Sequence, residues 1–350
     1  LAVPERFSKR LWRTLSLSGQ VALVTLQEAW DEAKLDAVAP ERIGIIIGGS
    51  NLQQREQMQI YETYAHQVDF VRPAFGLSFL DSDLCGLCTE QFGIRGSAFT
   101  LGGASASGQV AVLQAMQSVQ SGQVDVCIAM GALLDLSYLE CQALRSLGAM
   151  GSDRYADEAS FACRPFDKFH DGFIYGENCG VVVIERASTA LERQVKPCAD
   201  ILGGAIVMDG NRNPNPSQEG EVWVVQKALQ EAELEPEEID YINPHGTGSV
   251  IGDETEIQAL LQCHLSHAFI NTTKSITGHG LSAAGTVEVI ATILQMKERC
   301  LHPSRNLETP IIQACNWVSG EALPHTIEHA LTLSMGFGGV NTALCLKRHI

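Results

Sequence analysis

Short apolar runs that end in glycine recur along this chain and alternate with segments whose apolar residues follow helical spacing. The run RIGIIIGGS occupies residues 42–50, and VDVCIAMGA occupies residues 124–132. Both are short and rich in β-branched residues, which is typical of strands buried in a parallel sheet. Between them, apolar positions at helical spacing predict a helix that opens near Ser105 and Ser107 and stops at Gly122. The order strand, tight turn, helix, strand therefore predicts a βαβ unit.

Four later runs follow the same design, and we expect each to form a strand that ends in glycine or a polar turn. They are CGVVVIE at 179–185, DYINPHG at 240–246, KSITGH at 274–279 and ALTLSMGFGG at 330–339. Strands that alternate with helices over the whole chain predict an α/β fold with mostly buried sheets. At 350 residues the chain suits two domains or one large duplicated unit. A polar, proline-bearing stretch at 193–197 predicts a division near residue 198, which gives halves 1–198 and 199–350.

Composition argues against several classes of function. The formal net charge is -17, from 24 basic against 41 acidic residues, which disfavours binding to nucleic acid or to an anionic membrane. No apolar run approaches the roughly 20 residues that a membrane helix needs, so we expect a soluble protein. Eleven cysteines are scattered from Cys85 to Cys345, and the chain opens without a signal-peptide pattern. Together these features favour a reducing cytoplasm.

Two groups of potential metal ligands occur, and we expect neither to bind a metal. Cys85 and Cys88 form a single CxxC pair, while Cys263, His264 and His267 form a small cluster. A structural zinc site usually needs four ligands at paired spacings. We therefore interpret both groups as ordinary packing.

Three glycine-flanked segments carry polar side chains at a strand end or a helix start, which is where α/β enzymes usually gather a site. They are GGASASG at 102–108, NPHGTGSVIGDETE at 243–256 and KSITGHGLSAAG at 274–285. Each also has a structural explanation when taken alone. Ser105 could cap a helix, His245 could belong to a turn, and His279 could be a buried histidine with satisfied hydrogen bonds. Only their combination points to a function.

Taken in order, these segments resemble the β-ketoacyl synthases of fatty-acid and polyketide assembly. The matching patterns are ASASG, HGTG-x-x-x-GDETE, K-x-x-x-GH-x-x-x-AAG, GFGGVN at 336–341 and the intervening RPFDKFHDGFIYGENCG at 164–180. The resemblance implies a thiolase-like fold, in which two similar βαβ-rich halves pack in a layered α-β-α-β-α arrangement, usually as a homodimer. It implies no cofactor of the enzyme's own, because the substrate is carried on the phosphopantetheine of an acyl carrier protein.

The resemblance also assigns roles to individual residues. His245 and His279 match the two histidines that stabilise negative charge on the thioester oxygen. Lys274, with Glu256 or Glu288, would hold the second of these histidines in place. These five residues are therefore the expected catalytic and supporting set around residue 105.

Other residues are expected along the path of the substrate. By resemblance, Thr247 and Ser249 face the pantetheine arm, and Phe337 lies beside the pocket as a gate. The start of the chain resembles a basic helix near the pocket entrance that receives the carrier protein, although a solvated helix face explains it nearly as well. The basic residues of this candidate docking helix are Arg6, Lys9, Arg10 and Arg13.

The chain departs from the family at the nucleophile, because Ser105 stands at the position of the catalytic cysteine. A thiol with a pKa of about 8.5 becomes largely thiolate when a helix N-terminus lowers its pKa by one or two units. A hydroxyl is far less acidic, and the same field does not ionise it. The family's histidines act as donors to the substrate oxygen and not as a general base for residue 105. Acyl transfer to Ser105 should therefore be slow or absent.

Decarboxylation of a malonyl thioester needs no such nucleophile. The charge flows into the thioester carbonyl as carbon dioxide leaves, and two imidazole donors stabilise the resulting enolate. Both histidines are retained, so the chain resembles the ketosynthase-like decarboxylases of polyketide β-branching cassettes, in which serine replaces the cysteine. It does not resemble the chain-length-factor subunits, which lack this histidine pair. The predicted reaction converts malonyl-acyl carrier protein to acetyl-acyl carrier protein.

Further departures concern the pocket and the start of the chain. Met335 stands where many relatives have phenylalanine, and Gly102 and Gly103 replace a more polar pair before the nucleophile. The family's opening strand, with its V-x-x-TG-x-G pattern, has no counterpart before Leu1. A truncated chain and an omitted segment both explain this.

Two alternative functions stay open. The first is an ordinary condensing β-ketoacyl synthase whose cysteine was replaced by serine through engineering. The second is a non-catalytic partner that only binds a carrier protein or another ketosynthase. Retention of His245, Lys274 and His279 speaks against the second alternative.

Overall fold

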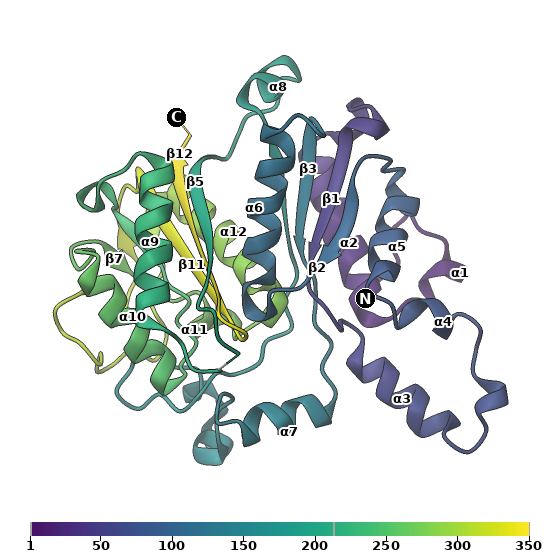
Figure 1. The fold of residues 1–350 in the computed structure, drawn as a ribbon, viewed down its shortest axis with the longest axis horizontal. Helices are drawn as coiled ribbons and strands as arrows, with labels where there is room; N and C mark the ends of the chain where they lie inside the picture. The colour runs from purple at the N-terminus through teal and green to yellow at the C-terminus, as the bar shows by residue number, and fades with distance from the viewer. Residues whose placement is uncertain (1, 213, 350) are drawn as a thin grey trace.

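The computed structural model describes residues 2–212 and 214–349, and two large β-sheets organise them (Figure 1). The first sheet has the order β2-β1-β3-β4, in which β1 is parallel to β2 and β3, and β3 is antiparallel to β4. Its strands are β1 (Ile43–Gly48), β2 (Ala98–Leu101), β3 (Val126–Gly131) and β4 (Gly180–Glu185). The strands predicted at 42–50, 124–132 and 179–185 are thereby confirmed.

The second sheet has the order β5-β12-β11-β6-β7-β9. Its strands are β5 (Ala199–Met208), β6 (Tyr241–Asn243), β7 (Phe269–Ile270), β9 (Asn316–Trp317), β11 (His329–Gly336) and β12 (Val340–Arg348). The strands predicted at 240–246 and 330–339 are confirmed as β6 and β11. A separate two-stranded ribbon pairs β8 (Cys300–Leu301) with β10 (Leu323–Pro324).

The two large sheets repeat one topology. The strands β4-β3-β1-β2 correspond to β12-β11-β6-β7, and each pair of neighbours runs in the same relative direction in both sheets. In the second sheet, β5 adds an antiparallel strand beside β12. Within the part of the chain that the structure describes, no strand takes the equivalent place beside β4. The chain is therefore a duplicated α/β unit.

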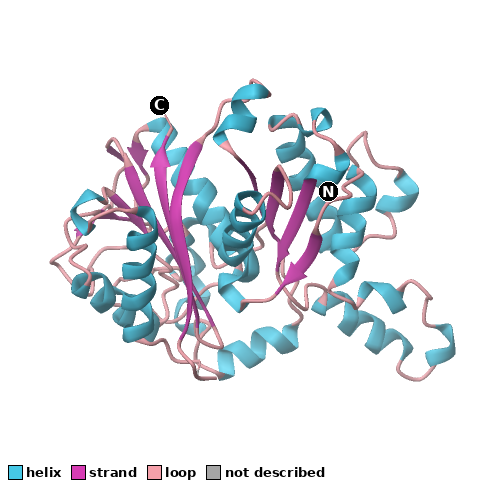
Figure 2. Ribbon diagram, turned by 45° about the horizontal axis from the view of Figure 1, so that its top comes forward, coloured by secondary structure: helices cyan, strands magenta, loops and turns pink. Residues whose placement is uncertain are grey.

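Helices separate and cover the sheets in five layers (Figures 1 and 2). The central layer consists of α6 (Ser107–Gln120) and α12 (Ala284–Glu298), which lie between the two sheets. The outer face of the first sheet is covered by α2 (Leu17–Glu32) and α5 (Ser82–Phe92). The outer face of the second sheet is covered by α9 (Gln218–Ala232) and α10 (Val250–Gln262).

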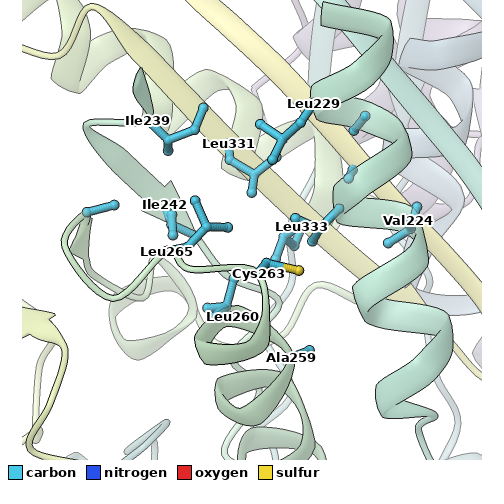
Figure 3. Close-up of a cluster of buried hydrophobic side chains, with 14 of the residues drawn as sticks. Val224, Leu229, Ile239, Ile242, Ala259, Leu260, Cys263, Leu265, Leu331 and Leu333 are labelled. Carbon is cyan, nitrogen blue, oxygen red and sulfur yellow. The ribbon is translucent and has the colours of Figure 1, made fainter. Parts of the chain in front are cut away.

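Three hydrophobic clusters fill the interfaces between these layers, one at the outer face of each sheet and one around the central helices that reaches both sheets. Figure 3 shows the cluster at the outer face of the second sheet, where Val224 and Leu229 of α9 and Leu260 of α10 meet Leu331 and Leu333 of β11. All five side chains are buried. Removal of this apolar area from water holds the layers together and fixes where the strand ends lie.

The two central helices cross in close contact at a pair of glycines. A Cβ atom on Gly108 would lie 2.8 Å from the carbonyl oxygen of Ser282, and one on Gly285 would lie 2.6 Å from the backbone nitrogen of Gln109. Side chains larger than hydrogen would force the helices apart at this crossing. The crossing therefore brings the N-terminal turns of α6 and α12 side by side.

The remaining helices are short or peripheral. They are α1 (Lys9–Trp12), α3 (Gln54–Tyr64), α4 (Phe75–Ser78), α7 (Tyr138–Ser146), α8 (Ala187–Glu192) and α11 (Lys274–Thr277). Across residues 2–212 and 214–349, no helix combines the length and apolar character needed to cross a membrane.

The strand predicted at 274–279 is wrong, because this segment begins with the helical turn α11. The strand of that unit is β7, which ends at Ile270. Beyond it, the backbone N–H of Ser275 donates to the carbonyl of Thr272, and Gly278 ends the turn with a φ of 70°. The polar residues after β7 therefore form a helical turn beyond the end of the strand and do not extend it.

Candidate active site

Ser105 lies in a tight turn between β2 and α6, at the N-terminal end of that helix. Ala104 adopts a φ of 49°, a left-handed conformation that is unusual for a residue with a side chain. The hydroxyl of Ser107 holds the turn, because it donates to the carbonyl of Ala104 at 2.7 Å and accepts from the N–H of Gly103 at 2.9 Å. The turn thus places Ser105 at the positive end of the α6 dipole.

The second half of the chain contains the same turn before α12. Leu281 has a φ of 51°, and Ser282 occupies the position equivalent to Ser105. The hydroxyl of Ser282, however, donates to the carbonyl of Ala132 at 2.8 Å. The two turns read GASASG and GLSAAG, so a comparison of the halves could have found this internal repeat from the sequence.

Ser105 and the two predicted histidines meet in one site. The Nε2 atom of His279 lies 3.0 Å from the Ser105 Oγ. The rings of His245 and His279 are nearly perpendicular, with centroids 5.5 Å apart, and Phe173 packs against the edge of His279 at 5.1 Å. His279 is only 2% exposed, whereas His245 keeps part of its surface open. Residues more than 170 positions apart in the sequence are thereby brought into contact.

Both histidines are held in the neutral form. Burial lowers the pKa of each ring well below its ordinary value, and the positive charge of Lys274 lowers the pKa further. The Nδ1 atom of each ring is buried, and no described residue forms a hydrogen bond with it. A buried N–H without a partner is rarer than an acceptor without one, so we assign the hydrogen of each ring to Nε2. Each imidazole then presents an N–H donor at its Nε2 edge.

Lys274 and Glu256 fix the backbone of His245. The Lys274 ammonium donates to the carbonyl of His245 and forms a buried ion pair with Glu288. The two carboxylate oxygens of Glu256 accept the N–H groups of His245 and Gly246, at 2.6 and 2.8 Å. Sequence reasoning expected these residues to hold the second histidine. Their contacts lie instead at the first, and Lys274 acts on His279 only through its charge.

The two supporting carboxyl groups have raised proton affinities. Burial raises the pKa of Glu288 to about 7 and that of Glu256 to about 8. The charge of Lys274 opposes this shift at Glu288, and the N–H donors of His245 and Gly246 oppose it at Glu256. At both carboxyl groups, burial therefore outweighs the partners that favour the charged form.

Asp253 organises the loop that follows His245, and sequence reasoning missed it. Its Oδ1 accepts the N–H of Gly248 at 3.0 Å, and its Oδ2 accepts the N–H of Phe166 at 2.7 Å and contacts His170 at 2.9 Å. Asp253 belongs to the GDETE motif three residues before Glu256. The two carboxylates are one helical turn apart and therefore lie on the same face of the helix. This spacing could have indicated from the sequence that a second carboxylate also binds the loop.

The predicted pantetheine residues lie on the same loop. Thr247 is 8% exposed, and its Oγ1 accepts the N–H of Ser249 at 3.1 Å. Ser249 is half-buried and occupies the N-cap position of α10, where its side chain makes no capping hydrogen bond. Both therefore lie beside the histidine loop, at the border between the site and its surface.

The end of β11 packs against the Ser105 turn. A Cβ atom on Gly336 would lie 2.2 Å from the carbonyl oxygen of Gly103, so only glycine fits there. The hydroxyl of Ser334 donates to the Ser105 carbonyl at 3.3 Å. Phe337 follows this contact and is 42% exposed, whereas Met335 is buried. The predicted gate thus directly follows the contact with the Ser105 turn, and its side chain is partly exposed.

The predicted docking residues lie apart from this site. Figure 1 places α1 beyond α5, on the far side of the first sheet from α11. The Arg6 guanidinium stacks on Phe92 at 4.3 Å from the ring centroid, so part of its role is packing. All four basic side chains are exposed at the surface. Because Arg6 also packs on Phe92, the other three are more available to a partner.

No described group of three His, Cys, Asp or Glu side chains is arranged to hold a metal ion. Cys85, Cys88 and Cys263 are buried, and burial raises the pKa of each thiol.

Comparison with known proteins places these features in a family. The model of the β-ketoacyl synthase N-terminal domain matches residues 5–190, and that of the β-ketoacyl synthase C-terminal domain matches residues 198–308. The chain is 62% identical over 347 residues to the polyketide biosynthesis malonyl-ACP decarboxylase PksF of Bacillus subtilis, which covers 99% of this chain and 84% of that protein.

Solved structures share the fold. A β-ketoacyl synthase from Burkholderia phymatum superposes with a TM-score of 0.90 at 26% identity, over 100% of this chain and 86% of that one. A structure of a type II PKS acyl-carrier protein in complex with its ketosynthase gives a TM-score of 0.87 at 25% identity, over 95% and 84% of the two chains. The thiolase-like fold predicted from the sequence is thereby confirmed.

Proposed function

The chain belongs to the β-ketoacyl synthase family, and from that premise we propose that it converts malonyl-acyl carrier protein to acetyl-acyl carrier protein with release of carbon dioxide. The main support for this proposal is a pair of neutral histidines whose ring centroids lie 5.5 Å apart, beside a serine in the turn that carries the nucleophile in this family. The name of the PksF relative supports the same reaction.

The two Nε2–H donors supply what decarboxylation requires. As the bond to the carboxylate breaks, its electron pair moves into the thioester carbonyl, and an oxygen between the two rings receives two hydrogen bonds. Burial strengthens these bonds because little water competes for the oxygen. Lys274 and Glu256 hold the His245 backbone, so the donors are in place before charge develops.

The same geometry disfavours condensation. With its hydrogen on Nε2, His279 donates to the Ser105 hydroxyl and does not take its proton. Ser105 then lacks the general base that a serine nucleophile needs. Release of carbon dioxide from malonyl carrier protein above the rate in buffer tests this proposal against a non-catalytic partner, which would release none.

We propose Lys9, Arg10 and Arg13 as a docking surface for the carrier protein, with Arg6 in a mixed packing role. Carrier proteins are typically acidic, and local basic charge offsets the repulsion expected from a net charge of -17. Reversal of Lys9 and Arg10 to Glu should raise the KM for malonyl carrier protein by about tenfold, because attraction becomes repulsion.

The control for this reversal is a small malonyl thioester, whose KM should stay constant. A matched double reversal at the exposed Lys196 and Lys297, which lie elsewhere on the surface, should leave both KM values unchanged. Equal effects of the Lys9 and Arg10 reversal on both substrates would remove the docking role.

We propose that the protein is a homodimer that pairs through β2. This strand is an edge of the first sheet, and its Phe99 is 42% exposed. Phe70 and Leu77, in the segment between α3 and α5, are also exposed, at 72% and 65%. Exposed edge strands and exposed apolar side chains are features of interaction surfaces. The substitution Phe99→Lys is expected to shift the protein from dimer to monomer in sedimentation analysis.

The matched control is Leu191→Lys, at a leucine that is 79% exposed on α8. This change should leave the dimer intact because α8 lies away from β2 (Figure 1). Dimerisation that survives Phe99→Lys, or that is lost equally in both variants, would contradict pairing at β2.

We also propose that the enzyme works in a reducing cytoplasm and supplies acetyl groups for a β-branching step of polyketide assembly. All eleven cysteines are free, which supports the compartment. The division into halves near residue 198 remains a proposal, supported by the end of the first sheet at β4 and the start of the second at β5.

A further inference from the structure

We propose that the Ser105 hydroxyl delivers the proton that converts the enolate into the acetyl thioester. The inference rests on the proposed decarboxylation and concerns the step after carbon dioxide leaves. The enolate carbon needs an acid at that point, and the site must supply one without disturbing the two donors at the oxygen.

Neither histidine serves as this acid. Both rings are neutral, and the Nε2–H of each is committed to the thioester oxygen during the reaction. The Nδ1 atoms are buried and carry no hydrogen in the assigned tautomer. The proton has to come from another group.

The hydrogen-bond pattern leaves Ser105 with a free donor. Its oxygen accepts from His279 Nε2–H at 3.0 Å, so its own hydrogen is available to point into the site. The two other hydroxyls at the turn are committed, since Ser107 donates to the Ala104 carbonyl and Ser334 donates to the Ser105 carbonyl. The thiol of Cys163 likewise donates to the Lys274 carbonyl.

The distances allow a direct transfer. In a thioester, the α carbon lies about 2.4 Å from the carbonyl oxygen, two bonds away. An oxygen that accepts from His279 lies on the same edge of that ring as Ser105 Oγ, which is 3.0 Å from Nε2. The α carbon can therefore approach the hydroxyl to the ~3–3.5 Å at which a proton transfers.

The step balances with water as the co-reactant. The bond between the α carbon and the carboxylate breaks, carbon dioxide leaves, and the electron pair forms the enolate. The enolate carbon then takes the Ser105 proton, the serine oxygen takes a proton from water, and the hydroxide that remains passes to the solvent, where it can combine with the carbon dioxide as bicarbonate. Developing charge on that oxygen is stabilised by the N-terminus of α6, a 14-residue helix.

The test measures where the methyl proton comes from. Malonyl carrier protein is converted in an equal mixture of H2O and D2O, and mass spectrometry gives the ratio of hydrogen to deuterium in the acetyl methyl group. When the proton comes from a single positioned hydroxyl, the transfer discriminates between hydrogen and deuterium to a characteristic extent, and this sets the ratio found in the methyl group. In Ser105→Ala the proton comes from mobile water, so the ratio should shift toward that of a malonyl thioester decarboxylated without enzyme.

Two further variants isolate the hydroxyl. Ser105→Thr retains an O–H and should restore the wild-type ratio, and Ser146→Ala, at an exposed serine on α7, should not move it. If Ser105→Ala fails to fold, Ser105→Gly carries the same comparison.

An unchanged ratio in a folded Ser105→Ala or Ser105→Gly would overturn the proton role while leaving decarboxylation intact. Absence of acetyl product from the wild type would instead overturn the proposed function.

Discussion

Replacement of either His245 or His279 by alanine is expected to lower the rate of carbon dioxide release from malonyl carrier protein by about 10²–10³-fold. Each ring supplies one of two donors to the oxygen that becomes negative in the transition state. Removal of one donor leaves that charge half stabilised in a buried site. The rate at saturating substrate measures this loss most directly, because the donors act on the transition state more than on binding.

Two controls separate this effect from general damage. His267→Ala changes an exposed histidine and should leave the rate unchanged. Ser105→Ala should lower the rate less than either histidine change, because Ser105 acts after the charge has formed. A loss below tenfold in both histidine variants would show that the oxygen is stabilised elsewhere.

The substitution Ser105→Cys is expected to convert the site into one that accepts an acyl group. The thiol would stand at the N-terminus of α6, which lowers thiol pKa values, and next to the two donors that bind a thioester oxygen. Incubation with acetyl carrier protein should therefore add one acetyl group to residue 105, detected by mass spectrometry of the peptide.

Cys163 provides an internal control in the same experiment. Burial raises the pKa of its thiol to about 12, and it should remain unmodified. Two results would show that residue 105 does not face the thioester carbonyl. One is an acetyl group on Cys163 with none on residue 105, and the other is no labelling at all in a variant that still decarboxylates.

Much of the architecture could be predicted because most of the buried strands have the sequence of a short apolar run that ends in glycine or a polar turn. The exception at 274–279 has a physical cause, since those residues look like the other polar strand ends but follow a strand only two residues long, β7. Local pattern does not reveal where such a strand stops. The five-layer arrangement came from the family resemblance and not from periodicity.

The sequence predicted which residues form the site more completely than it predicted which of them contact one another. Ser105, His245 and His279 meet as expected, but the sequence does not show that Lys274 and Glu256 bind the backbone of His245. These contacts depend on how α10 and α11 lie beside the His245 loop, which is a tertiary property. The internal repeat of the serine turn was readable from GASASG and GLSAAG, whereas the free hydrogen of Ser105 follows only from the hydrogen bonds of its neighbours.

The most direct test of the central claim is the intact mass of malonyl carrier protein after incubation with the enzyme. We expect a decrease that corresponds to loss of carbon dioxide, complete conversion to the acetyl form, and no acyl group on the enzyme. The His245→Ala and His279→Ala variants should convert little over the same time. Malonyl carrier protein that keeps its mass after long incubation with ample enzyme would contradict the account, as would acetyl product that arises only through an acylated Ser105.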